Sequence, residues 1–295
     1  MLRPLAAWLD RRSLGSGSSV LDRLAIGGAI ASETWLRESD RPPARGRSRP
    51  QEVTLVEGET NDLLAAIAEA AEVTGGDLQA LGMRLTRKWG LGDTDLSRLA
   101  SRISRALGVP DPVAAIEAPP SLDRFVDQAM FVPLPPVCRT VILVSPHYRM
   151  LSARDPFAAS RLLLAVAHEV AGHACDYRAL MPIRPQEARL DRELLEGWGI
   201  VAEGRLSGLG LDEHALHLLY QVKRLLPLAQ RSLDEPSWMA MRNTIEATWP
   251  GFFTSAATAV LRRATGTHAR GLVRVRRALQ VHGEAARSGL ASPWT

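Results

Sequence analysis

Cysteine is scarce in this sequence of 295 residues, which contains only Cys138 and Cys175. Two cysteines cannot form a disulfide framework within one chain, and they cannot build a zinc site of four thiolates. Any metal site must therefore use histidine and carboxylate side chains.

Long apolar runs are also missing. The best run near the N-terminus covers residues 24–32, well short of the ~18 to 20 residues that cross a bilayer. We therefore expect no membrane span. Arg11 and Arg12 precede small and apolar residues, as in a twin-arginine export signal, but Asp22 and Arg23 interrupt the apolar part. We expect a cytoplasmic protein, with export as the weaker alternative.

Lysine is nearly absent. Of the 36 basic residues only Lys88 and Lys223 are lysine, and the others are arginine. The net charge is +4 and the pI is near 9.6. We interpret this arginine excess as compositional bias and expect no nucleic-acid partner. Seven arginines lie between residues 262 and 287, with Glu284 as the only acid. This pattern predicts a solvated, basic terminal helix, and a surface for an acidic partner is the alternative.

The composition that remains is that of a globular protein, with 46% apolar and 23% charged residues. Residues 37–50 are rich in arginine and proline and cannot bury enough apolar surface to fold. We expect residues 1–50 to be an N-terminal segment with a disordered linker. We expect residues 51–118 to form a small helical unit and residues 119–295 the main domain.

Apolar spacing and turn residues predict a mainly α fold with minor β structure. Strands are expected at 52–57 and 141–144. Helices are expected at 61–73, 77–88, 94–107, from 156 to about 179, 186–206, 213–231, 236–248, 254–264 and 268–282.

The strongest chemical signal is the segment His168-Glu169-Val170-Ala171-Gly172-His173 within a predicted apolar helix. It is one residue longer than HExxH, in which two histidines four residues apart face one ion. At five residues the offset on an ideal α-helix becomes about 140°, too wide for one tetrahedral ion. The helix must therefore loosen locally, for example by a π-bulge, and we expect Gly172 to be where this departure is concentrated.

A catalytic zinc ion needs a third protein ligand. The segment Glu196-Gly-Trp-Gly-Ile-Val-Ala-Glu203 offers one, because Glu196 lies 23 residues after His173, enough for the chain to return on an antiparallel helix. Glu193, one turn earlier, is the rival ligand.

These two segments resemble the gluzincin metallopeptidases. HEVAGH is similar to the HExxGH of dipeptidyl peptidase III. Together with EGWGIVAE it resembles a bacterial family of unknown function that carries HExxPGHH and EGWALYAE, and the aminopeptidase N family uses a similar segment for its third ligand. The resemblance covers residues 160–205 and departs from the second pattern at Ala171 and Ala174.

The resemblance implies that His168, His173 and Glu196 are Zn²⁺ ligands and that Glu169 is the general base. It also implies a zincin-like metallopeptidase core of antiparallel helices within 119–295.

Further residues could support such a site. Glu203 and Asp176 lie at helical spacing from the expected ligands and could orient them. Cys175 is expected to be a buried small residue rather than a ligand. For the donor to an oxyanion, the sequence offers a stripe on the helix at 213–231 that contains His214, His217, Tyr220 and Arg224. His147 and Tyr148, after the strand at 141–144, are the competing pair.

The expected function is zinc-dependent hydrolysis of a peptide or related amide by a metal-activated water. Two alternatives remain. One is a metal-dependent tailoring enzyme acting on a non-peptide substrate, and the other is a non-catalytic scaffold that retains metal.

Overall fold

The computed structural model describes residues 53–91, 95–109, 114–118, 129–134, 139–146, 155–174, 192–253 and 256–283. The described part is mainly helical, as predicted. Its helices are α3 Glu57–Thr74, α4 Leu78–Trp89, α5 Leu96–Ala106, α7 Pro156–Ala167, η2 His168–His173, α9 Arg192–Glu203, η3 Gly204–Leu209, α10 Leu211–Ser232, α11 Glu235–Thr248 and α12 Ala256–His282. Residues 1–50, with the predicted linker and export-like segment, lie outside the described residues.

A small sheet contains three described strands, β1 Ala114–Glu117, β2 Ala129–Leu134 and β3 Arg139–Val144. Their order is β1-β3-β2, with β1 parallel and β2 antiparallel to β3. The strand predicted at 141–144 is confirmed as part of β3, in which Ile142, Leu143 and Val144 are buried. Sequence reasoning missed β1 and β2, because both are short and β2 lies in a proline-rich passage.

The strand predicted at 52–57 is wrong over its described part. Residues 53–56 are irregular, and α3 begins at Glu57. The reason is local, because the Glu59 carboxylate accepts a hydrogen bond from the Val56 backbone N–H at 3.0 Å. This contact caps the start of a helix, where acidic residues are also favoured by the helix dipole.

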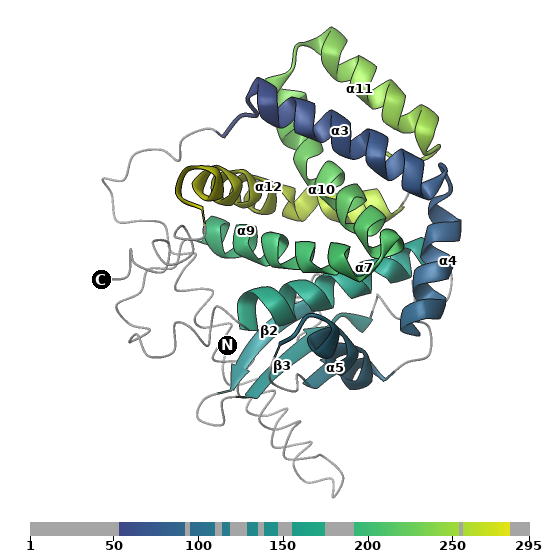
Figure 1. Cartoon of the computed structure of the whole chain (residues 1–295), viewed down its shortest axis with the longest axis vertical. Helices are drawn as coiled ribbons and strands as arrows, with labels where there is room; N and C mark the ends of the chain where they lie inside the picture. The colour runs from purple at the N-terminus through teal and green to yellow at the C-terminus, as the bar shows by residue number, and fades with distance from the viewer. Residues whose placement is uncertain are drawn as a thin grey trace, which may run out of the picture.

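The helices form layers above the sheet (Figure 1). In this view α9 lies between α12 above it and α7 below it, the strands lie below α7, and α3 and α11 lie at the opposite end of the molecule. The predicted unit 51–118 and the predicted main domain share one hydrophobic core. Its members from the two segments include Leu63, Leu85, Ile103, Leu163, Leu216 and Leu272.

The two helices predicted at 254–264 and 268–282 form the single helix α12. Three of its described arginines form ion pairs within the protein instead of a solvated basic face. Arg270 and Arg274 contact the Glu193 carboxylate at 2.6 and 3.1 Å, and Arg277 contacts Glu59 at 2.7 Å. These contacts attach α12 to α9 and α3, and tertiary packing overrides the weak helix preference of the Thr-Gly-Thr segment at 265–267. None of the described helices is long and apolar enough to cross a membrane.

Candidate metal centre

The segment HEVAGH forms a π-helix that continues α7 without a break. Helix α7 begins at Pro156, after Asp155, whose side chain accepts hydrogen bonds from the first backbone N–H groups. At the far end, the backbone N–H of Ala174 donates to the carbonyl of Glu169, five residues back. This i to i+5 pattern brings His168 and His173 onto one side of the helix. The predicted departure from α geometry is confirmed, although it extends over all of residues 168–173.

His168, His173 and Glu196 lie together as a group that could hold a metal ion. We call these three residues the His-Glu cluster. The two Nε2 atoms of His168 and His173 are 3.0 Å apart. The Glu196 Oε2 atom lies 3.3 Å from the His168 Nε2 and 3.7 Å from the His173 Nε2. Glu193, the rival ligand, lies outside this cluster and binds arginines of α12 instead.

Glycines explain how α9 approaches the π-helix closely enough. A Cβ atom on Gly172 would lie 2.6 Å from the Cα of Gly199, and a Cβ on Gly199 would lie 2.5 Å from the His168 Nε2. On the other side of α9, Gly197 is packed against the backbone of Gly271 in α12. The φ of Gly172 is outside the left-handed region, so this glycine is required for close packing and not, as predicted, for backbone freedom.

The second ring nitrogen of His168, Nδ1, contacts a buried ion pair between Glu203 and Arg224. This nitrogen contacts the Glu203 Oε1 at 2.7 Å, and Arg224 donates to both Glu203 oxygens at 2.6 and 2.8 Å. Burial opposes ionisation of Glu203, but Arg224 and His168 outweigh it and lower the pKa of Glu203 to about 2. Glu203 thus lies where the sequence predicted an orienting carboxylate, with a direct contact to His168.

The charges around the imidazoles favour a bound cation. Burial alone would lower the pKa of His168, but its hydrogen bonds to Glu196 and Glu203 raise it to about 10. Burial would likewise raise the pKa of Glu196, but His268, His168 and His173 hold it well below the ordinary value. When no metal ion is bound, a proton on His168 compensates the negative charge of these carboxylates. A bound metal ion would replace that proton.

Glu169 contacts strand β2 of the sheet. Its Oε2 accepts a hydrogen bond from the Phe131 backbone N–H in β2 at 2.8 Å. Burial raises the pKa of Glu169, and this effect exceeds the opposite influence of His173 and His168. Among the described strands β3 is central and β2 lies at an edge, so the sheet edge beside the cluster belongs to β2, not to the strand at 141–144 as expected.

A fourth histidine, His268 of α12, lies beside the cluster. Its Nε2 is 2.9 Å from the Glu196 Oε2, and its ring centroid is 6.0 Å from that of His168. Sequence reasoning missed it, because His268 lies 72 residues after Glu196 in a basic segment without any recognisable ligand spacing. Only the packing of α12 along α9 brings it here.

The predicted donor stripe on α10 does not face the cluster as a unit. His214 contacts Glu69 of α3 at 2.7 Å, and the Tyr220 ring packs near Phe157 at the start of α7. Arg224 reaches His168 only through Glu203. His217 is buried and contacts the Gln221 side chain, and burial lowers the pKa of His217 to about 4.

The predicted residues His147, Tyr148, Cys175 and Asp176 lie outside the described residues. No protein-family model, curated protein or solved structure matches this chain. The resemblance to gluzincins is therefore carried by HEVAGH and EGWGIVAE alone.

Proposed function

We propose that this protein is a zinc-dependent hydrolase that cleaves a peptide or a related amide bond. The observation that carries the proposal is the convergence of His168, His173 and Glu196, with the ligand atoms all within 4.8 Å of one another. The buried Glu169, adjacent to the first ligand on the same π-helix, supplies the second element of such a site.

The spacing of the ligand atoms supports zinc. Ligands at ~2.0 to 2.1 Å in a tetrahedron are about 3.3 to 3.4 Å apart. The observed separations of 3.0, 3.3 and 3.7 Å lie around this value. Two imidazoles and one carboxylate are also a donor set of catalytic zinc sites, whereas Ca²⁺ and Mg²⁺ prefer oxygen ligands alone.

Glu169 is proposed as the general base. Bound Zn²⁺ would polarise the substrate carbonyl and make a water molecule acidic enough to react near neutral pH. Glu169 would accept the proton of that water and would pass it to the leaving amine. The Phe131 N–H holds Oε2 at 2.8 Å, and among the described residues Oε1 accepts no hydrogen bond, so it is available for the proton. The raised pKa of Glu169 brings it closer to the pH at which such a transfer is efficient.

His268 is proposed as the donor to the oxyanion, in place of the stripe on α10. Its side chain is 27% exposed and its Nε2 lies 2.9 Å from a ligand oxygen, so it borders the site from the solvent side. An extended peptide could add to the edge of β2 as a further strand, which would bring its backbone beside Glu169.

The test is digestion of a mixed-sequence peptide library, read by mass spectrometry, with zinc-loaded and chelator-treated protein. We expect cleavage with the zinc-loaded protein only. A His168→Ala/His173→Ala double variant should neither bind zinc nor cleave, whereas His214→Ala, a histidine paired with Glu69 away from the cluster, should do both. Zinc binding without cleavage of any peptide would contradict the peptidase proposal and favour a non-peptide substrate or a scaffold.

A further inference from the structure

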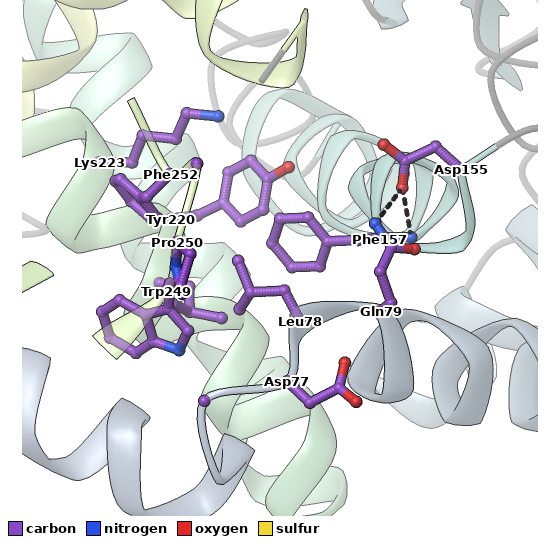
Figure 2. Close-up of a pocket in the computed structure, with 13 residues that line it drawn as sticks. Asp77, Leu78, Gln79, Asp155, Phe157, Tyr220, Lys223, Trp249, Pro250 and Phe252 are labelled. Atoms are coloured by element: carbon purple, nitrogen blue, oxygen red, sulfur yellow. Dashed lines mark hydrogen bonds between the residues drawn. The ribbon is translucent and has the colours of Figure 1, made fainter. Parts of the chain in front are cut away.

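A cavity lies near the start of α7 (Figure 2), whereas the His-Glu cluster follows the other end of this helix. The volume of the cavity is about 290 Å³. Phe157, which lines it, precedes His168 by 11 residues, so the two sites are about 16 Å apart along the helix axis. Most of the cavity wall is apolar, formed by Leu78, Phe157, Leu219, Trp249, Pro250 and Phe252.

Two carboxylates at the cavity cap helices. Asp155 accepts hydrogen bonds from the Phe157 and Ala158 backbone N–H groups at 3.0 Å, and it also accepts one from Gln79 at 3.1 Å. Asp77 accepts one from the Ala80 N–H at 2.8 Å. These contacts stabilise the starts of α7 and α4.

The Tyr220 hydroxyl has an unmet hydrogen-bonding capacity at this cavity. Tyr220 is only 3% exposed, and its Oη has no hydrogen-bond partner among the described residues. Buried hydroxyl groups in folded proteins are nearly always paired. A ligand atom in the cavity would supply the partner that the described protein atoms do not.

Lys223 lines the cavity and brings a side-chain amine to it. It is 8% exposed, and its Nζ lies 5.7 Å from the centre of the Tyr220 ring. Figure 2 shows the Tyr220 ring between Lys223 and Phe157. The Arg161 guanidinium lies over the same tyrosine ring, 5.8 Å from the ring centre.

These surroundings change the chemistry of the amine. Burial is the largest cause, and the positive charges of Arg161 and Arg224 add to it, so the pKa of Lys223 falls to about 6. The other titratable groups near Lys223 are Tyr220, whose pKa is raised by burial to about 12, and the carboxylates of Asp155 and Asp77. An amine that is uncharged at neutral pH, in an apolar cavity beside other cations, is a nucleophile.

We propose that this cavity binds a small 2-oxo acid with an apolar side chain, and that the Lys223 amine forms an imine with its carbonyl carbon. The apolar wall suits the side chain, and the positive charge of Arg161, which lies over the Tyr220 ring, attracts the carboxylate. The Nζ lone pair forms the new C–N bond as the C=O π electrons move to oxygen, and loss of water then yields the imine. Amine and carbonyl give imine and water, with no oxidant or reductant, and the metal takes no part.

Phenylpyruvate is a suitable probe, with cyanoborohydride to reduce the imine to a stable amine. Because the chain has only two lysines, peptide mapping by mass spectrometry assigns the adduct without ambiguity. Lys88 is the internal control, an exposed amine paired with Glu213 at 2.8 Å. At pH 7 we expect labelling of Lys223 to exceed that of Lys88 about tenfold or more, because the pKa of Lys223 is lowered to about 6 and most of its amine is uncharged.

Lys223→Met should abolish the pocket adduct, and Lys88→Met should leave it unchanged. Circular dichroism verifies that both variants fold. The rate at Lys223 should already level off just above pH 6. An adduct found only on Lys88 or the terminal amine would overturn the proposal. Equal labelling of Lys223 in the folded and the urea-unfolded protein would also overturn it.

Discussion

Gly199 of α9 lies directly against the imidazole of His168, so closely that a Cβ atom at position 199 would lie 2.5 Å from the His168 Nε2. That nitrogen is one of the converging ligand atoms. The absence of a side chain at position 199 is therefore what allows His168 to point at Glu196.

The first prediction follows from this contact. Gly199→Ala should push the His168 ring aside and lower zinc affinity by about 10- to 100-fold, the range found when a metal ligand loses its support. Competition with a chromophoric chelator measures the affinity. Gly208→Ala is the matched control, because a Cβ there meets nothing within 4 Å. Equal affinities in the two variants would contradict the packing argument.

Gly172→Val should also weaken the site while leaving overall helicity nearly intact. The branched side chain would collide with the Cα of Gly199, 2.6 Å from the new Cβ, and would separate α9 from the π-helix. We expect a severalfold or greater loss of zinc affinity, measured beside circular dichroism. Gly58→Val in α3, where a new Cβ has open space, should change neither property.

Glu169→Gln should retain zinc and lose hydrolysis. The amide fills nearly the same space but cannot accept the proton of water, so a loss on the order of 10² or more is expected. Elemental analysis verifies the zinc content, and the peptide assay gives the activity. Exposed Glu72 provides the control, and Glu72→Gln should be fully active. Undiminished activity in zinc-loaded Glu169→Gln would assign the proton transfer to another group.

Arg224→Met should destabilise the fold by about 3 to 5 kcal/mol, because it leaves the buried Glu203 carboxylate without its strongest partner. Denaturant titration measures the free energy of unfolding. The exposed pair between Arg84 and Asp212 offers the comparison, and Arg84→Met should cost less than about 1 kcal/mol. Similar costs at the two positions would show that burial of Glu203 does not set the energy of its ion pair.

Lys223 makes stability depend on pH. Its pKa is about 6 in the folded protein and 10.5 ordinarily. Between these values the unfolded chain binds a proton that the folded protein lacks, so the free energy of unfolding rises with pH, by at most about 1.4 kcal/mol per pH unit. Lys223→Met removes this dependence. The variant should therefore be more stable than the parent at pH 7, and the difference should shrink towards pH 10.

Thermal or urea unfolding across this pH range measures the difference. Lys88→Met, at an exposed amine, is the matched control. A stability difference for Lys223→Met that stays constant from pH 7 to 10 would mean that Lys223 is charged in the folded protein.

The sequence alone determined the helices and the existence of the His-Glu cluster. HEVAGH contains two histidines five residues apart, and a helix can direct both at one ion only by local widening, so the departure from α geometry was predictable from spacing. The third member of the cluster was also predictable, because Glu196 lies in a distinctive segment. Helix periodicity and capping residues such as Asp155 are local signals, readable without knowing what the helix packs against.

Tertiary structure alone decided what surrounds the cluster. The contact of Gly199 with His168 and the approach of His268 depend on how α9 and α12 pack, and no local spacing encodes that packing. For the same reason, helical spacing wrongly grouped His214 and Tyr220 with Arg224 as one stripe facing the cluster. Periodicity shows which side chains share a helix face, but α10 contacts different neighbours along its length: α3 at His214, α7 at Tyr220, and Glu203 at Arg224.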